Sequence, residues 1–129
     1  MDKPLADRVA IVTGGAGGIG SRIARAYTSA GAHVVIASRS QDKLDELASE
    51  LSANGPGALA VATDVTVPDD VANLVDSTVD AFGRLDILVN NAGGAMFVKP
   101  PLDLKPEEWN AAIALNLTSV FLCLSLIHI

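Results

Sequence analysis

Cysteine, aromatic residues and basic residues are all scarce in this sequence of 129 residues. Cys123 is the only cysteine, so no disulfide can form within the chain and a reducing compartment is expected. Aromatic residues make up 4% of the chain, so the core must be built from Ala, Val, Leu and Ile. Nine Lys and Arg stand against 15 Asp and Glu, and the net charge of −6 argues against non-specific nucleic-acid binding, which needs clustered cations. We therefore expect a cytoplasmic protein that binds no nucleic acid.

Charge is missing altogether from Trp109 to Ile129, a stretch long enough to span a membrane. No basic cluster flanks the stretch, and it contains polar residues, which together favour a buried helix of a larger domain. The polar residues are Asn110, Asn116, Thr118, Ser119, Ser125 and His128. The start of the chain also lacks the basic and then apolar order of a secretory signal, because Asp2 and Asp7 interrupt it. We therefore expect no membrane partner. The alternative is a membrane-anchored protein, which recovery of the intact chain in the soluble fraction would exclude.

Apolar runs alternate with amphipathic stretches along the chain. Each apolar run is rich in aliphatic or β-branched residues and predicts a buried strand, at 8–13, 33–38, 58–65 and 85–93. Helices are expected between the strands and after the last one, at 19–30, from a Ser40 cap to the Asn-Gly-Pro-Gly of 54–57, at 68–82 and from Pro106 onward. Helical spacing predicts the buried faces as Ile19, Ile23, Ala26 and Ala30, then Leu44, Leu47, Ala48 and Leu51, and then Val71, Leu74, Val75, Thr78, Val79 and Phe82.

This alternation predicts an α/β fold in which helices cover both faces of a parallel sheet. Right-handed crossovers then favour a Rossmann-like, doubly wound parallel sheet with the strand order 3-2-1-4-5-6. We expect this chain to contain the first four strands of that order and the helix that follows the fourth strand. Residues 1–123 would then form the N-terminal part of a single dinucleotide-binding domain.

Five glycines occupy the seven positions from Gly14 to Gly20, between the first strand and the first helix. Glycine permits a positive φ and a close approach to the main chain, and a helix N-terminus offers free N–H groups to an anion. This context predicts that the turn binds the pyrophosphate of a dinucleotide. The alternative is a glycine turn with a packing role alone.

Four segments resemble the short-chain dehydrogenase/reductase family, in the family's order. "TGGAGGIG" resembles the family's glycine signature, and "NNAG" (Asn90 to Gly93) resembles its second signature. Asp64-Val65 resembles the pair that contacts adenine in the family. "WNAAIALNLTSVF" resembles the segment that carries the family's structural and catalytic asparagine, which is Asn116 in this chain. The match covers most of this chain but about the first half of a family member, and it most resembles 3-oxoacyl-carrier-protein reductase relatives.

The resemblance implies an oxidoreductase that transfers a hydride between a nicotinamide cofactor and a hydroxyl or carbonyl substrate. It also implies a set of cofactor-binding positions. These are Thr13, Gly14, Gly18, Ile19, Gly20, Ser38, Arg39, Asp64, Val65, Asn91, Ala92 and Gly93. Family members commonly form homo-dimers or homo-tetramers, so the full-length protein is expected to do the same.

The choice of cofactor depends on the residues that end the second strand. An acid there would hold the ribose 2′-hydroxyl of NAD, but this chain has Ser38 followed by Arg39. Because a guanidinium can bind a 2′-phosphate in a bidentate manner, we predict NADP(H) rather than NAD(H). The alternative is a surface arginine paired with Asp42 or another carboxylate.

Each remaining position also has a structural interpretation. Asp64 could cap the turn before Pro68, Asn90 and Asn91 could bond only neighbouring backbone, and Asn116 could be a buried, bonded amide. No second ligand lies near His33 or His128 at metal spacing, and Cys123 has no base nearby in sequence, so no metal site is expected and none of these three is given a catalytic role.

The family's catalytic tyrosine and lysine have no counterpart in these residues. Tyr27 is the only tyrosine, and Gly31 stands four positions later, so no Tyr-x-x-x-Lys occurs. We therefore expect an N-terminal fragment that is itself inactive because the catalytic Ser, Tyr and Lys are missing. A non-catalytic dinucleotide-binding sensor is the alternative. We also interpret 124–129 as a non-native tail, because "LSLIHI" brings no cap, charge or terminating glycine.

Overall fold

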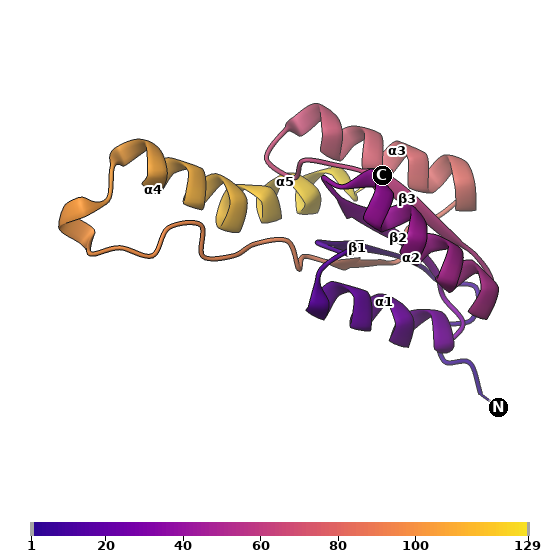
Figure 1. The fold of residues 1–129 in the computed structure, drawn as a ribbon. Helices are drawn as coiled ribbons and strands as arrows, with labels where there is room; N and C mark the ends of the chain where they lie inside the picture. Colours follow the sequence, from indigo (N-terminus) through magenta and orange to yellow (C-terminus); the bar gives the residue numbers. More distant parts are fainter. Residues whose placement is uncertain (1, 129) are drawn as a thin grey trace.

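A four-stranded parallel sheet forms the centre of the computed structural model, which describes residues 2–128 (Figure 1). Its strands are β1 (Val9–Thr13), β2 (His33–Ser38), β3 (Ala58–Ala62) and β4 (Ile87–Val89), in the order β3-β2-β1-β4. Residue Val9 pairs with His33 on one side of β1, and Ala10 pairs with Ile87 on the other. The predicted Rossmann-like α/β fold and the order of its first four strands are therefore confirmed.

Helices cover both faces of the sheet. Helices α1 (Gly18–Ser29) and α2 (Gln41–Asn54) pack on one face, and α3 (Pro68–Phe82) lies on the other (Figure 1). Alternate strand residues divide between the two layers, so that Val12 joins the α1/α2 core and Ile11 joins the core under α3. All five side chains of β1 are buried, which explains why its sequence is apolar without alternation.

The helix faces agree with the predicted periodicity for α2 and α3 but not for α1. The buried residues of α1 are Gly20, Ala24 and Thr28, whereas Ile19 is 70% exposed. The buried face is displaced by one residue because Gly20 must lie against the preceding turn, which leaves Ile19 pointing outward.

The predicted Ser40 side-chain cap is also wrong: Ser40 is the N-cap residue of α2, but its hydroxyl makes no capping hydrogen bond.

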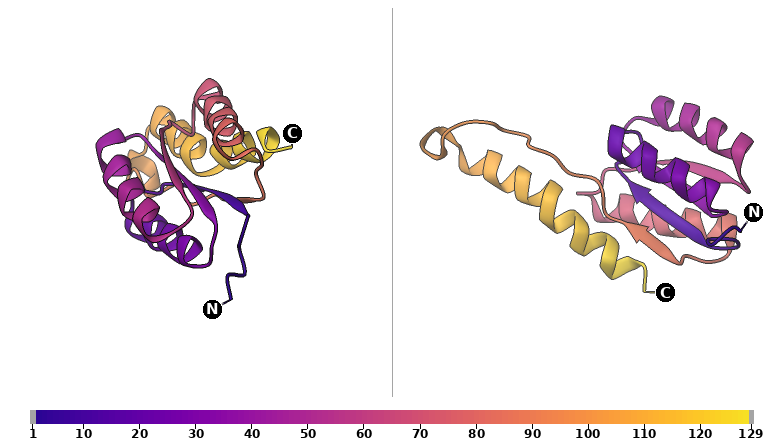
Figure 2. Two further views of the ribbon diagram at one scale, coloured as in Figure 1. Left: turned by 90° about the vertical axis from the view of Figure 1, so that its right-hand side faces the viewer. Right: turned by 90° about the horizontal axis from the view of Figure 1, so that it is seen from below.

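After β4 the chain leaves the body of the molecule and returns as one long helix. Residues 90–105 run outward, through the 3-10 turn η1 (Pro101–Asp103), beside the helix that follows (Figure 2). That helix consists of α4 (Pro106–Ile113), the π-helical turn η2 (Ala114–Thr118) and α5 (Ser119–Leu126). Ser119 and Cys123 are buried where α5 packs on α3. By length and composition alone the helix Pro106–Leu126 could cross a membrane, and 11% of its most apolar window is buried.

An acidic residue joins β1 and β4 at the amino edge of the sheet. The carboxylate of Asp86 accepts hydrogen bonds from the backbone N–H of Val9 at 2.9 Å and from Nε of Arg84 at 2.8 Å, and Arg8 lies 3.5 Å away. The hydrogen bond from Arg84 and then that from Val9 lower the pKa of Asp86 to about 2, although burial acts in the opposite direction.

This network predicts a pH-dependent contribution to stability. Because the pKa of Asp86 is lower in the folded state than in the unfolded chain, its contribution is full above about pH 4 and is lost as the pH falls toward 2. Urea unfolding of the wild type and of Asp86→Asn should therefore differ by about 1 kcal/mol at pH 6, a modest value because exposed ion pairs are screened. The difference should approach zero near pH 2; a constant difference across this range would contradict the assignment.

Candidate functional site

The glycine turn lies at the carboxyl edge of the sheet, where β1 passes into α1. Gly14 has a φ of +63°, which favours glycine, and the N–H of Gly15 donates to Ala37 O on the neighbouring strand at 3.1 Å. A Cβ on Gly20 would collide with the carbonyl oxygen of Gly14 and lie 2.7 Å from Nδ2 of Asn91. These contacts hold the turn and the start of α1 close together, so the packing interpretation applies to Gly14 and Gly20.

The outer part of the same turn is open. No heavy atom lies within 4 Å of the position that a Cβ on Gly18 would take, so packing within the described residues does not require glycine there. Gly17 is the N-cap of α1 and supplies no side chain to its first N–H groups. These N–H groups border a hollow of about 420 Å³ that Gly14, Ile19 and Asn91 help to line. Free N–H groups at the positive end of a helix favour an anion at this place.

Thr13 connects the glycine turn with the turn after β4. Its Oγ1 accepts the N–H of Asn91 at 3.1 Å and that of Ala92 at 3.0 Å, and donates to Val89 O at 3.3 Å. The Nδ2 of Asn91 in turn donates to Gly14 O at 3.2 Å. One buried hydroxyl thus holds two motifs that are far apart in the sequence at a common edge.

A second hollow, of about 190 Å³, lies between the ends of β2 and β3. It is lined by Gly14, Ala37, Ser38, Arg39, Thr63, Asp64, Val65, Ala92, Gly93 and Leu115. Within the described residues Arg39 forms no ion pair and no hydrogen bond, so the predicted alternative of a pair with Asp42 is not formed. Hydrogen bonds from the hydroxyl and then the N–H of Thr66 lower the pKa of Asp64, and the charge of Arg39 lowers it further.

Asn116 lies in the π-helical turn and faces the loop after β4. Its Oδ1 accepts the N–H of Gly94 at 2.9 Å, and its Nδ2 donates to Gly94 O and to Ala112 O, each at 3.0 Å. A Cβ on Gly93 would lie 2.7 Å from this Oδ1. The predicted alternative was a buried, hydrogen-bonded amide. The amide of Asn116 is hydrogen-bonded, but the residue is exposed, so the predicted burial is wrong. Gly94 and Leu115, which also border the site, were not predicted, because no spacing or charge in the sequence points to them.

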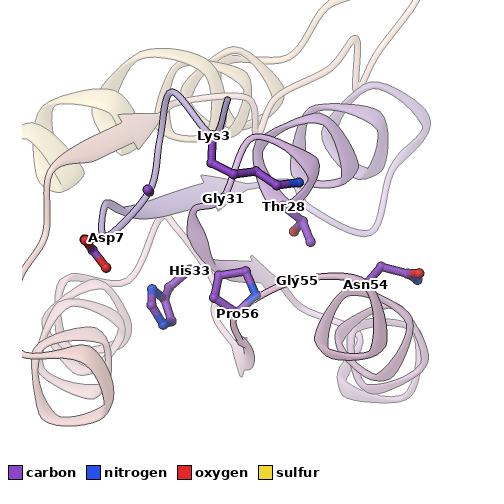
Figure 3. Close-up of a pocket in the computed structure, with 9 residues that line it drawn as sticks. Lys3, Asp7, Thr28, Gly31, His33, Asn54, Gly55 and Pro56 are labelled. Atoms are coloured by element: carbon purple, nitrogen blue, oxygen red, sulfur yellow. The ribbon is translucent and has the colours of Figure 1, made fainter. Parts of the chain in front are cut away.

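The residues that were given no role lie apart from this edge. Cys123 is buried against α3, and burial raises the pKa of its thiol. His33 packs against Phe82 with ring centroids 4.8 Å apart and the ring planes tilted by 46°. It also lines a hollow of about 390 Å³ at the amino edge, together with Lys3 and Asp7 (Figure 3). Among residues 2–128 no group of three His, Cys, Asp or Glu side chains is placed to hold a metal ion.

The two hollows at the carboxyl edge adjoin one another. Gly14, Ala92 and Gly93 line both, so an elongated ligand could extend from the start of α1 to the ends of β2 and β3. Donors of hydrogen bonds concentrate at the first hollow, and a cation and a carboxylate flank the second. This arrangement suits a ligand with a central anionic group and a polar, planar group at one end.

Comparison with known proteins gives consistent matches. A family model described as short chain dehydrogenase matches residues 8–128. The chain is 43% identical over 120 residues to a 3-oxoacyl-[acyl-carrier-protein] reductase of Synechocystis sp., covering 92% of this chain and 48% of that protein. It is 44% identical over 123 residues to a cis-4-hydroxycyclohexanecarboxylate dehydrogenase of Sinomonas cyclohexanicum. This match covers 95% of this chain and 49% of that protein.

Solved structures agree with these matches. A metagenomic short-chain oxidoreductase in complex with NADP has a TM-score of 0.89 and 41% identity, covering 95% of this chain and 56% of that one. A short-chain type dehydrogenase/reductase from Mycobacterium marinum has a TM-score of 0.90 and 38% identity. The match covers 95% of this chain and 49% of that one. The chain spans about half the length, or less, of the curated relatives it matches.

Proposed function

The chain belongs to the short-chain dehydrogenase family, and on that premise we propose that it is the N-terminal part of an NADP(H)-dependent oxidoreductase acting on a hydroxyl or carbonyl substrate. The observation that carries the proposal is the junction of the two hollows at Gly14 and Gly93, beside the uncapped start of α1. When bound, the nicotinamide ring supplies the hydride acceptor or donor. The residues of this chain hold the dinucleotide in place.

Each element at the carboxyl edge has a separate part in this proposal. The N–H groups of Gly18, Ile19 and Gly20 bind the pyrophosphate, which can come close because Gly18 has no side chain. Asp64 and Val65 receive the adenine, with the N–H of Val65 free of any partner in the described chain. The turn of Asn91, Ala92 and Gly93 borders the nicotinamide side, and Thr13 fixes that turn. Asn116 fixes the backbone of Gly94 beyond it.

The proton-transfer groups of the reaction are proposed to lie outside these 129 residues. A phenol with an ordinary pKa near 10 is a poor base at about pH 7 unless a cation lowers that value, and no Tyr-x-x-x-Lys occurs here. The full-length protein, meaning the product of the complete reading frame that contains these residues, is therefore the form to assay. Its turnover of NADPH with a carbonyl substrate, absent from the 129-residue chain, is the expected result.

Arg39 provides the test of cofactor choice. We expect Arg39→Ala in the full-length protein to weaken NADPH binding at least tenfold and to leave NADH binding within twofold, because only NADPH carries the 2′-phosphate that the guanidinium can bind. Isothermal titration calorimetry with both nucleotides measures the two affinities. Arg22→Ala, which removes an exposed arginine from α1 outside both hollows, is the matched control. Equal affinities for the two nucleotides in wild type and Arg39→Ala would end the NADP assignment.

A further inference from the structure

The junction of α2 and β3 contains the only Asn-Gly pair of the sequence, Asn54-Gly55. Asn54 is the last residue of α2, and Gly55 leaves the helix in an extended conformation with a φ of −161° and a ψ of −169°. This conformation is the one expected of a residue that precedes proline, here Pro56. Both Asn54 and Gly55 are exposed, so solvent reaches the carboxamide and the peptide bond that follows it (Figure 3).

The peptide bond between Asn54 and Gly55 is not held by backbone hydrogen bonds within residues 2–128. The N–H of Gly55 has no acceptor there, whereas the corresponding N–H of Gly83, at the end of α3, donates to Val79 O at 2.7 Å. The carbonyl oxygen of Asn54 likewise accepts no hydrogen bond from the described chain, since it belongs to the last turn of a helix. The ψ of Asn54 can therefore change without breaking a backbone hydrogen bond.

The packing of this junction requires glycine at position 55. A Cβ there would collide with Cγ2 of Thr28, which is buried beside the end of α2. Because glycine has no side chain, the nitrogen of Gly55 is also open to approach by the side chain before it. The contact that requires glycine thus excludes the steric protection that a larger residue would give.

We propose that Asn54 is a site of spontaneous covalent modification, at which the nitrogen of Gly55 attacks Cγ of Asn54 and closes a succinimide ring. A bond forms between that nitrogen and Cγ, the bond from Cγ to Nδ2 breaks, and Nδ2 leaves as ammonia with the proton of the Gly55 N–H. A water molecule then opens the ring at one of its two carbonyl groups. Opening at Cγ gives aspartate, and opening at the main-chain carbonyl gives isoaspartate, in which the main chain runs through Cβ and Cγ.

Both products weaken the end of α2. The hydrogen bond that Nδ2 of Asn54 donates to Glu50 O, at 2.8 Å, is lost. The new carboxylate lies at the negative end of the helix, and α2 has no basic residue in its last turn. Isoaspartate also adds one carbon to the main chain where Gly55 lies against Thr28. The protein therefore loses stability with age through a residue that lines neither hollow of the proposed cofactor site.

Incubation of the full-length protein at mildly alkaline pH, where the attacking nitrogen loses its proton more readily, tests the proposal. Asn73 is the matched internal control, because it is also exposed on a helix but lies inside α3 and precedes Leu74. Mass spectrometry of peptides with electron-transfer fragmentation measures both products at each asparagine. We expect Asn54 to react about tenfold faster than Asn73 or more, and no more than about tenfold slower than in a synthetic peptide of residues 50–59. A slower reaction than that would show that the folded helix end protects Asn54, and would overturn the inference.

Two variants separate this reaction from other damage to the protein. Asn54→Gln keeps an amide but needs a larger ring, so its midpoint of urea unfolding should stay constant during incubation while that of the wild type falls. Gly55→Ala in a Thr28→Ser background, which lacks the colliding methyl group, should react at Asn54 about tenfold more slowly than Thr28→Ser alone. Equal rates in these two proteins, or an Asn54→Gln midpoint that falls as fast as that of the wild type, would contradict the assignment.

Discussion

Gly20→Ala should abolish dinucleotide binding and lower the free energy of unfolding by about 3 kcal/mol or more. The added methyl group would collide with the carbonyl oxygen of Gly14 and crowd Nδ2 of Asn91. The Gly14 carbonyl belongs to the backbone and accepts the bond from Asn91, so it cannot move without separating the two turns that Thr13 joins. Calorimetric titration with NADPH and urea unfolding of the full-length protein measure the two losses.

Gly18→Ala is the matched control for this prediction. It adds the same methyl group two residues earlier, where nothing lies within 4 Å, and alanine favours a helix more than glycine does. Stability should therefore stay the same or rise by up to about 1 kcal/mol, while NADPH affinity falls at least tenfold because the methyl group occupies the approach to the pyrophosphate. Gly18→Ala with unchanged affinity, or a stable Gly20→Ala, would contradict the division between a packing glycine and a ligand-facing glycine.

Thr13→Val should lower the free energy of unfolding by about 2 kcal/mol, because it removes an acceptor without changing the shape of the side chain. The N–H of Asn91 keeps a second acceptor in Val89 O at 3.0 Å, but the N–H of Ala92 loses the acceptor that Thr13 provides. A half-buried N–H without a partner is destabilising in the amount stated. Since the same hydroxyl positions the turn beside the proposed nicotinamide site, NADPH affinity should fall about tenfold.

Thr13→Ser distinguishes the hydroxyl from the methyl group. Serine keeps both accepted hydrogen bonds, so its unfolding free energy should lie within about 1 kcal/mol of the wild type and its NADPH affinity within threefold. Urea unfolding and titration of the two variants side by side provide the measurement. If serine were destabilising and valine were close to the wild type, the packing of the methyl group rather than the hydroxyl would hold the two turns together.

Local patterns were sufficient to predict the sheet and the three helices that cover it. An aliphatic run such as Val9–Thr13 is typical of a strand that is buried on both faces of a parallel sheet, and the glycines predicted the position of the first turn. The predicted buried face of α1 was displaced by one residue from the observed one. The reason is that the prediction used the spacing of hydrophobic side chains, and glycine has none. Gly20 is the most constrained residue of that face even though it buries no side chain.

The long helix shows why part of the candidate site was not predictable. Periodicity predicts a helix from Pro106 but carries no information on the π-helical turn over Ala114–Thr118, which brings Asn116 opposite Gly94. That contact joins residues 22 positions apart and depends on the path of the loop between them. The Thr66 to Asp64 bonds were equally invisible, because Thr beside Asp occurs in many turns and its direction is set by the backbone.

The central place of β1 has a consequence for the growing chain on the ribosome. β1 leaves the exit tunnel first and finds β2 soon afterwards, but its other neighbour, β4, begins about 75 residues after β1 ends. At ordinary translation speeds of about 5–20 residues per second, one edge of the fully buried strand β1 stays without its partner for roughly 4–15 s. A nascent polypeptide of this kind is a natural client for chaperones that bind aliphatic segments, and slow codons between α2 and α3 would lengthen its dependence on them.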